Sequence, residues 1–329
     1  MLRIGIIGLR HPHIFSLQGD VAAMDGAVIV AVAEDEPSLQ SKAGQLGVPI
    51  YRDYRQMIDK ENLDAVGVCP VNSEKGRVIC ECLDSGLHVI ADKPLLTTVE
   101  DLELVRRAWQ RSGKHLLSML TLRYDRPFLA LRRFVDEGGL GEPVALFATG
   151  PHRLNLPTRY PWMLRDDLCG GIIVDLGCHY VDAMRWFSGR ECRALAAVHG
   201  NKRFTQLEGF TSYAQVQMRL DGGVVGTVQV DWLSPDAAPY WGDMRFMMTG
   251  TKGSAEARTW PEPQALVATL DKPPFVLELP TESSSVGVDF LRAIIEGRDT
   301  GLSTEDCLEA TRLTILARQA AESGTIVSA

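Results

Sequence analysis

Short apolar runs alternate with helical segments through the first 120 residues of this 329-residue chain. The runs are rich in β-branched residues and several end at glycine or a polar turn, which is typical of buried parallel strands. We expect strands at 3–8, 28–33, 65–69, 88–91 and 115–119, and helices near 14–24, 38–45, 54–59, 74–85 and 99–112. This alternation predicts a parallel sheet with right-handed crossovers. Ligands of such sheets bind beyond the carboxyl ends of the strands.

The turn after the first expected strand runs from Gly8 to His13 and reads GLRHPH. A turn that cradles a dinucleotide pyrophosphate normally has three glycines, in the pattern GxGxxG, and only Gly8 is present here. Its position still favours phosphate binding at the N-terminus of the first helix, and Arg10 can add a cation. Gly8, Arg10 and His13 are therefore candidate cofactor-binding residues. The alternative is a loop that has lost its affinity for nucleotides, because Arg10 and His13 are bulky.

An acidic residue lies where the second strand ends, about 20 residues after the glycine turn, as in proteins that bind the ribose of NAD. Glu34 holds this position and is followed by Asp35 and Glu36. A carboxylate here would repel the 2′-phosphate of NADP, so NAD is the expected cofactor. The alternative, a solvated acidic turn, suits Asp35 and Glu36 better than Glu34.

The segment 170–182 reads GGIIVDLGCHYVD and carries two acids and an imidazole at helical spacing. Asp175, His179 and Asp182 would lie on one face of a helix, since a helix advances 3.6 residues per turn. A neutral histidine can accept a proton near pH 7, so this segment is a candidate proton-transfer site. The alternative is structural, with Asp175 as a helix cap and His179 as a hydrogen-bonded core residue.

The remainder of the chain, 123–329, predicts a second domain built on a largely antiparallel sheet. Apolar and polar residues alternate along 214–220, the pair Gly222-Gly223 with Asp221 is a hairpin signal, and 224–232 is the expected return strand. A further strand is expected at 244–249. We expect a dinucleotide-binding domain at 1–122 and a substrate-binding and oligomerisation domain of α+β type at 123–329, whose last helices can pack back on the first domain.

The turn Ala91-Asp92-Lys93-Pro94 follows the fourth expected strand. Together with the strand–helix start and the GGxxxDxGxHxxD run, it resembles the glucose–fructose oxidoreductase and inositol dehydrogenase (Gfo/Idh/MocA) family of NAD(P)-dependent oxidoreductases. The resemblance extends over nearly the whole chain, including Val71-Asn72, the stretch 162–166 and the closing segment 289–324. It implies an N-terminal Rossmann-like domain and an open C-terminal sheet whose outer face forms a subunit interface. A homodimer or homotetramer is therefore expected.

The resemblance also implies roles for single residues. The lysine of the Lys-Pro turn and the Asp and His of the DxGxH motif line the substrate site in that family, so Lys93, Asp175 and His179 are the expected catalytic residues. Two departures from the family pattern are the bulky residues of the first turn and Asp92, where glutamate is more usual. The expected cofactor-binding residues are Gly8, Arg10, His13, Glu34, Asn72 and Lys93. Weaker substrate-binding candidates are Arg123, Tyr124, His152, Trp162 and Arg165.

Composition narrows the possible partners. A formal net charge of −8 argues against a nucleic-acid-binding surface, and no apolar run approaches the ~18 residues of a membrane span. The seven cysteines form no paired CxxC knuckles, which indicates reduced thiols in a cytoplasmic protein rather than a zinc site. His11 and His13 form an H-x-H pair, but no third ligand follows at matching spacing, so no metal is expected.

These features favour an enzyme that transfers hydride between NAD(H) and a secondary alcohol or ketone of a sugar, polyol, inositol or related small molecule. His179 would be the base, Lys93 would stabilise the reacting oxygen, and Asp175 would orient either the base or the substrate. Two alternatives stay open. One is an elimination or hydrolysis assisted by tightly bound NAD, and the other is a non-enzymatic ligand-binding or regulatory protein with a degraded nucleotide loop.

Overall fold

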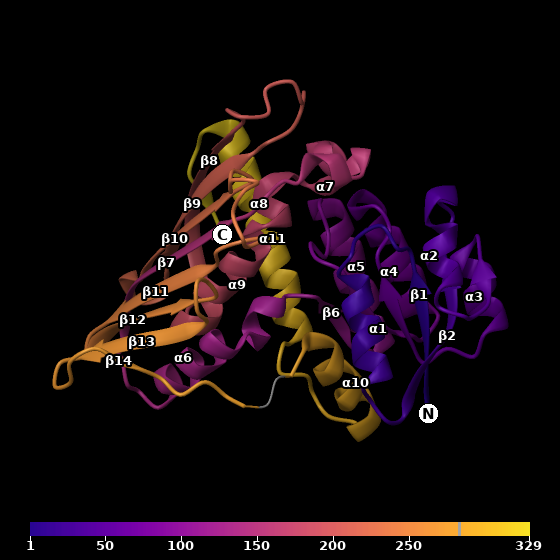
Figure 1. Cartoon of the computed structure of the whole chain (residues 1–329), viewed down its shortest axis with the longest axis horizontal. Coiled ribbons are helices and arrows are strands. Elements are labelled where there is room, and N and C mark those ends of the chain that lie inside the picture. Colours follow the sequence, from indigo (N-terminus) through magenta and orange to yellow (C-terminus); the bar gives the residue numbers. More distant parts are fainter. Residues whose placement is uncertain (282–283) are drawn as a thin grey trace. The chain divides into compact units, whose positions relative to one another are not determined.

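The computed structural model describes residues 1–281 and 284–329 and divides into two compact units (Figure 1). The first unit comprises residues 1–120, 168–170 and 284–311, and the second takes the remaining described residues. The expected α/β architecture with two different sheets is confirmed. None of the described helices combines the length and apolar character needed to cross a bilayer.

The first unit contains a six-stranded parallel sheet in the order β3-β2-β1-β4-β5-β6. Every expected strand of this region forms, and each lies within two residues of its predicted bounds. The two-residue β3 was not expected, because it is too short to leave an apolar pattern. The strands are β1 (Leu2–Ile7), β2 (Ala27–Ala33), β3 (Ile50–Tyr51), β4 (Ala65–Val68), β5 (His88–Ala91) and β6 (Leu116–Ser118).

The helices of the first unit connect these strands, as right-handed crossovers require. They are α1 (Ile14–Ala22), α2 (Gln40–Gly44), α3 (Tyr54–Lys60), α4 (Lys75–Asp84) and α5 (Val99–Ser112). Helix α5 is capped at both ends: the Thr98 hydroxyl accepts from the Asp101 amide, and Gly113 closes the helix at φ 63°. Helix α10 (Val286–Glu296) packs on α1, although more than 260 residues separate them in sequence.

The second unit is a nine-stranded mixed sheet in the order β14-β13-β12-β11-β7-β10-β9-β8-β15. Strands β7 and β10 pair in parallel, and the other pairs among the described residues are antiparallel. The expected alternation along 214–220 is confirmed, with Ala214, Val216 and Met218 buried. The strands are β7 (Pro143–Pro151), β8 (Cys192–Gly200), β9 (Tyr213–Leu220), β10 (Val225–Asp231), β11 (Arg245–Gly250), β12 (Gly253–Arg258), β13 (Gln264–Thr269), β14 (Phe275–Val276) and β15 (Val327–Ser328).

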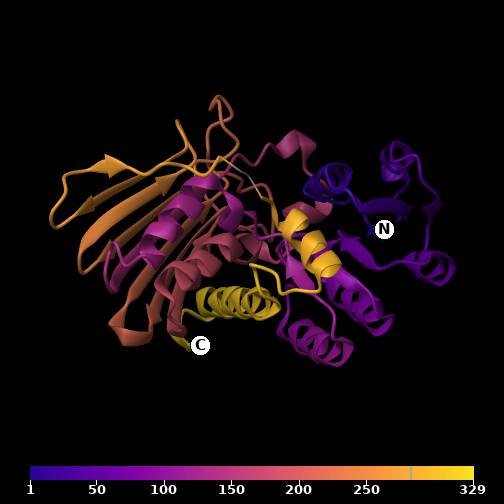
Figure 2. The same cartoon turned by 90° about the horizontal axis from the view of Figure 1, so that it is seen from below.

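Helices cover one face of this sheet (Figure 2). The core beneath them includes Phe128, Phe187 and Phe246, and the last two rings stack with centroids 4.2 Å apart. Such aromatic side chains bury the largest apolar areas and so anchor the helices to the sheet. The helices are α6 (Arg126–Asp136), α8 (Gly171–Asp175) and α9 (Gly177–Ser188). The short α7 (Asp166–Cys169) lies between α6 and α8 in the sequence, and the long α11 (Thr304–Ser323) starts in the first unit and ends in the second.

Candidate active site

The turn after β1 places its backbone, not its side chains, against the end of β4. Gly8 has φ +80°, and a Cβ atom there would lie 2.5 Å from the carbonyl oxygen of Cys69. Only glycine fits this conformation and this close approach. The amide of Arg10 donates to the same Cys69 oxygen at 3.1 Å. The first glycine of a dinucleotide turn is thus present in its structural role, although the other two are replaced.

The side chain of Arg10 is held by carboxylates. Its guanidinium lies 3.2 Å from a Glu34 oxygen and 3.2 Å from a Glu36 oxygen, and it also pairs with Asp35. We expected Arg10 to supply a cation to a cofactor phosphate. The structure instead gives its charge three acidic partners from the end of β2.

Glu34 is almost fully buried, and the protein's own groups bind both of its oxygens. The amide of Leu9 donates to Oε2 at 2.6 Å and the amide of Glu36 donates to Oε1 at 2.8 Å. Burial raises the pKa of Glu34, while these amides and Arg10 oppose the rise. The Glu34 carboxylate, which we expect from the sequence to bind a ribose, therefore holds the backbone of the β1–α1 turn through the Leu9 amide. Its neighbour Asp35, with a side chain 76% exposed, is the more accessible acid.

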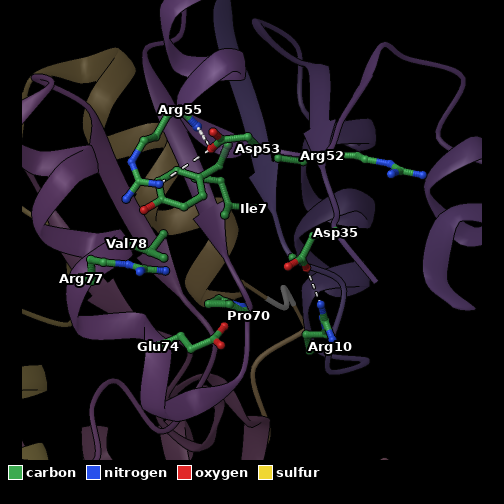
Figure 3. A pocket seen from close by; sticks show the side chains of 13 residues that line it. Ile7, Arg10, Asp35, Arg52, Asp53, Arg55, Pro70, Glu74, Arg77 and Val78 are labelled. Carbon is green, nitrogen blue, oxygen red and sulfur yellow. Dashed lines mark hydrogen bonds and ion pairs between the residues drawn. The ribbon is translucent and has the colours of Figure 1, made fainter. Parts of the chain in front are cut away.

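A cavity of about 240 Å³ opens at the carboxyl ends of β1, β2 and β4, beside the Gly8 turn (Figure 3). Open α/β sheets bind ligands in this position. Charged side chains of both signs line it, with apolar contacts from the strand ends. The lining residues are Ile7, Gly8, Arg10, Ala33, Asp35, Arg52, Asp53, Tyr54, Arg55, Pro70, Glu74, Arg77 and Val78.

Lys93 follows β5 and is buried, with only 5% of its surface exposed. Its turn is fixed by a second lysine that sequence reasoning missed. The ammonium of Lys75, fully buried in α4, donates to the carbonyl oxygens of Asp92 at 2.7 Å and Pro94 at 2.8 Å. The sequence does indicate that Lys75 is buried. It shares one face of α4 with Ile79 and Cys82, at i+4 and i+7, and both of these residues are buried. Lys75 is a positioning residue for the Lys93 turn.

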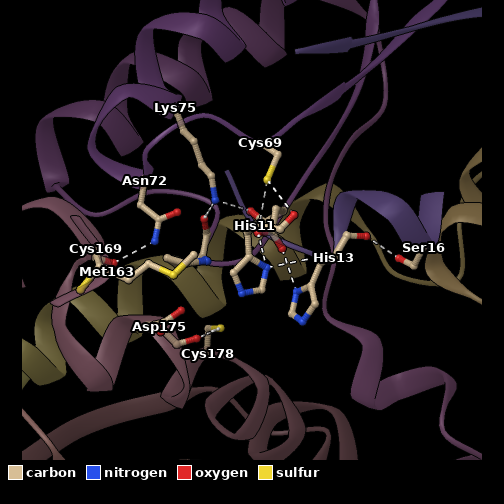
Figure 4. Close-up of polar contacts among 12 residues, drawn as sticks. His11, His13, Ser16, Cys69, Asn72, Lys75, Met163, Cys169, Asp175 and Cys178 are labelled. Atoms are coloured by element: carbon tan, nitrogen blue, oxygen red, sulfur yellow. Dashed lines mark hydrogen bonds and ion pairs between the residues drawn. The ribbon is translucent and has the colours of Figure 1, made fainter. Parts of the chain in front are cut away.

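Asn72, an expected cofactor-binding residue, lies at the carboxyl end of β4 and is buried. Its amide nitrogen donates to the carbonyl oxygen of Cys169 at 3.0 Å, a contact drawn in Figure 4. That bond uses one of the four hydrogen-bonding positions of the side chain. Asn72 therefore binds the Cys169 carbonyl and still has donor and acceptor positions that a cofactor could use.

His13, at the third glycine position of the pattern, turns its ring toward Asp92. Its Nδ1 lies 2.9 Å from one Asp92 oxygen, and Nδ1 of His11 lies 3.0 Å from the other. Burial lowers the pKa of His11 to about 4, so that ring is neutral at pH 7. Burial also acts on Asp92, but the two imidazoles outweigh it and hold the pKa of this carboxyl well below its usual range. The sequence offers no third ligand for the His11–His13 pair at matching spacing, whereas the fold places the Asp92 carboxylate, 79 residues after His13, against both rings.

The motif 170–182 is not one continuous helix. Helix α8 ends at Asp175, and α9 begins at Gly177 after Leu176. The three side chains therefore lie on two successive helices, with Asp175 at the end of α8 and His179 and Asp182 on α9. His179 is 9% exposed and Asp182 is 1% exposed. The pair Gly170-Gly171 has positive φ at both residues, which explains why glycines precede the motif.

Arg123, a weaker substrate candidate, forms a buried ion pair with Asp182. Its Nε and Nη2 donate to the two carboxylate oxygens at 2.7 and 2.6 Å, and both side chains are at most 6% exposed. The guanidinium also lies over the Trp186 ring at 5.4 Å. This bidentate pair ties the segment after β6 to α9, so its demonstrated partner is a side chain of the same unit.

The other substrate candidates are spread over several loops of the second unit. His152 Nδ1 lies 3.0 Å from the Gly150 oxygen, and its ring packs edge-on to Trp232. Arg165 is exposed and pairs with Asp167 at 2.6 Å, as expected of a surface residue. Tyr124 and Trp162 are half-buried in short 3-10 turns.

Comparisons with known proteins agree with this organisation. Residues 2–119 match the profile of the oxidoreductase family with an NAD-binding Rossmann fold, and residues 128–256 match the GFO/IDH/MocA C-terminal domain. A myo-inositol 2-dehydrogenase from Thermotoga maritima is 27% identical over 256 residues, which cover 77% of this chain and 74% of the relative. A D-xylose 1-dehydrogenase (NADP(+)) from Haloferax volcanii is 25% identical over 99% of both chains.

Solved structures show the same fold. A Thermotoga maritima protein solved as a candidate oxidoreductase superposes with a TM-score of 0.91 at 25% identity, covering 100% of both chains. Levoglucosan dehydrogenase in complex with NADH superposes with a TM-score of 0.86 at 19% identity, covering 99% of this chain and 98% of the other. From the two matched profiles and the Gly8, Lys93 and 170–182 motifs in their places, we conclude that this chain belongs to the Gfo/Idh/MocA family of oxidoreductases.

Proposed function

We propose that this protein transfers hydride between NAD(H) and a secondary alcohol or ketone of a sugar, a polyol, an inositol or a related small molecule. The observation that carries the proposal is the buried Lys93 ammonium at the carboxyl end of β5, in a chain of an NAD-binding oxidoreductase family. The relatives that match the chain are named as inositol and xylose dehydrogenases. Those names favour hydride transfer over an NAD-assisted elimination or a non-enzymatic role.

The first unit fits a dinucleotide. The Gly8 turn leaves no room for a Cβ atom and so presents backbone, and the adjacent cavity could receive the adenosine half. Asp35 at the rim would bind the ribose hydroxyls, which favours NAD because a carboxylate repels the 2′-phosphate of NADP. His13 and Asn72 would flank the remaining part of the cofactor.

NADP is the second candidate cofactor. Arg52 and Arg77 line the same cavity with exposed side chains, and guanidinium groups are suited to bind a phosphate. One of the relatives is also named as an NADP(+) enzyme. The two cofactors therefore need direct comparison.

The nicotinamide of a bound cofactor supplies the hydride chemistry. His179 would accept the proton of the substrate hydroxyl during oxidation and return it during reduction. The Lys93 ammonium would donate a hydrogen bond to the reacting oxygen and stabilise the negative charge that develops there. Asp175 would hold a neighbouring hydroxyl or orient the imidazole. Tyr124, His152 and Trp162 offer aromatic surfaces for a sugar-like ring, and Arg123 and Arg165 are the cationic candidates.

A panel of inositols, polyols and aldoses, followed through NADH absorbance, tests this proposal. Substitution of His179→Gln and Lys93→Met should each lower kcat about 10²–10⁴-fold on the best substrate, the usual contribution of a positioned acid or base. Millimolar NAD should still raise the melting temperature of both variants, since ligands that bind only the folded state stabilise it.

His199→Gln, on β8 of the same unit as His179, is the matched control and should keep wild-type turnover. Unchanged kcat in His179→Gln would remove this residue from the mechanism. A thermal shift with NADP but not with NAD would reverse the cofactor preference. Neither shift nor turnover with either cofactor would overturn the proposed function.

We also propose a cytoplasmic homodimer or homotetramer. All seven cysteines are free thiols, and the outer face of the second sheet exposes Val198, Val225 and Met247. The strand register sets Met247 beside Phe147 and Val225 beside Ala145, which makes two apolar pairs on this face. Light scattering during gel filtration measures the oligomeric state, and a monomer would overturn this part of the proposal.

A further inference from the structure

Two imidazoles and one carboxylate converge where the β1–α1 turn meets the end of β5. A ring nitrogen of His11, a ring nitrogen of His13 and a carboxylate oxygen of Asp92 offer three ligand atoms that all lie within 4.8 Å of one another. Figure 4 shows the two imidazole rings side by side next to Cys69. All of these residues belong to the first unit, so the cluster does not depend on the second.

The chemistry of this cluster is that of a transition-metal site. Two imidazole nitrogens and a carboxylate oxygen are ligands that Zn²⁺ and its neighbours favour, whereas Mg²⁺ and Ca²⁺ favour oxygen alone. Metal–ligand bonds of about 2.0–2.1 Å in a tetrahedron place the ligand atoms about 3.3–3.4 Å apart. His13 Nδ1 lies 2.9 Å from Asp92 Oδ1 and His11 Nδ1 lies 3.0 Å from Asp92 Oδ2, so each imidazole would move a few tenths of an ångström away from its own carboxylate oxygen to admit an ion.

The surroundings hold the ligands in place. Asp92 is 1% exposed, the Cys69 thiol lies 3.7 Å from its Oδ2, and the Lys75 ammonium fixes its backbone carbonyl. His11 is anchored by its carbonyl contact with the same thiol at 3.6 Å. Partners that orient ligands in this way are a regular part of metal sites. The His13 side chain is 37% exposed, which leaves a path for an ion to enter from solvent.

We propose that His11, His13 and Asp92 form a binding site for one Zn²⁺-like divalent transition-metal ion, with three protein ligands and an open fourth position. The site shares His13 with the proposed cofactor-binding residues and would add a cation beside the dinucleotide turn. The same distances also fit two imidazole N–H groups donating to Asp92 with no metal bound, and the experiment below separates the two arrangements.

Untagged full-length protein should be loaded with Zn²⁺, freed of excess metal by gel filtration, and assayed for bound zinc by mass spectrometry. We expect about one equivalent per chain. Co²⁺ in place of Zn²⁺ should give the visible absorption bands of a four-coordinate site. His13→Gln should weaken binding at least about 100-fold in competition with a chromophoric chelator, since even the loss of an outer-shell partner costs about 10–100-fold. The double variant His11→Gln/His13→Gln should retain no metal.

His115→Gln is the matched control. His115 pairs with His88 at a ring distance of 5.1 Å in the same unit, and it lies outside the proposed ligand set. This variant should bind zinc as the wild type does. The double variant keeps all seven cysteines and should show a wild-type circular dichroism spectrum, so its loss of zinc would exclude thiol binding and unfolding. Wild-type protein that retains no zinc, or a double variant that retains as much as the wild type, would overturn the proposal.

Discussion

At the scale of single residues, the partners of a side chain decide which role it can take. Glu34 and Asp35 are adjacent acids at the end of β2, and the sequence favours Glu34 for the ribose. Two backbone amides and Arg10 bind Glu34, while Asp35 lines the cavity with most of its side chain exposed. The buried Glu34 carboxylate would have to give up these hydrogen bonds to bind a ligand. The exposed Asp35 is therefore the better candidate to bind the ribose.

Asp125 provides a test of burial at the same scale. Burial raises the pKa of its carboxyl from 3.8 to about 6, and its side chain makes no capping hydrogen bond to α6. Because the pKa is higher in the folded state, the folded protein loses stability as pH rises from about 4 through 6. Asp125→Asn removes this loss. It should stabilise the protein by about 2 kcal/mol at pH 8, after allowance for ~0.3–1 kcal/mol of lost helix-dipole attraction, and by only about 0.5 kcal/mol at pH 4.

Urea unfolding of the variant and the wild type at pH 8 and pH 4 measures this difference. Asp59→Asn, at an exposed position on α3, should change stability little at either pH. An equal effect of Asp125→Asn at both pH values would show that ionisation of this carboxyl does not matter.

At the scale of elements, glycines show how closely helices and strands approach one another. Gly76 lies in α4 where α5 packs against it, and a Cβ there would be 2.4–2.7 Å from side-chain atoms of Asp101. Gly19 lies in α1 with no atom within 4 Å of the corresponding position. Both glycines lie within helices, Gly76 in the first turn of α4 and Gly19 in the second half of α1, and they differ in the space around them.

This contrast predicts that a glycine-to-alanine substitution changes the stability of the protein in opposite directions at the two positions. Gly19→Ala should stabilise the protein by about 0.5–1 kcal/mol, because alanine restricts the unfolded chain and favours the helix. Gly76→Ala should destabilise it by about 1–3 kcal/mol, because the added methyl forces α4 and α5 apart. Thermal and urea unfolding of both variants measure whether the free energy of unfolding rises or falls. Stabilisation by Gly76→Ala would mean that Asp101 moves aside at little cost.

At the scale of the whole molecule, the first unit is assembled from distant segments. Strand β6 is an edge of the parallel sheet, and residues 304–311 of α11 cover part of it. The Leu116 amide donates to the Thr304 hydroxyl and the Ser118 amide donates to the Cys307 thiol, both at 3.3 Å. An uncovered strand edge exposes unpaired backbone groups, so this segment completes the sheet.

A fragment of residues 1–122 should therefore fold poorly by itself. It lacks α10, which packs on α1, and the segment that covers β6. We expect no cooperative thermal transition by circular dichroism, and a restored transition when residues 284–311 are fused through a flexible Gly/Ser linker. A fragment 1–122 that melts like the full-length protein would show that these contacts are dispensable.

The sequence by itself determined the alternating strands and helices of the first sheet apart from β3, the antiparallel character of the second sheet through β9, β10 and β11, and the positions of Gly8, Lys93 and the 170–182 motif. Those features depend on apolar periodicity, glycine conformation and turn chemistry within about ten residues, which a single sequence displays. Only the tertiary structure decided which polar groups meet: Arg10 with Glu34, Arg123 with Asp182, and His11 and His13 with Asp92. The tertiary structure also divides the segment 170–182 into two helices on either side of Leu176. Such contacts depend on how strands and helices that are distant in sequence pack together, because strand order and burial set which side chains share a space.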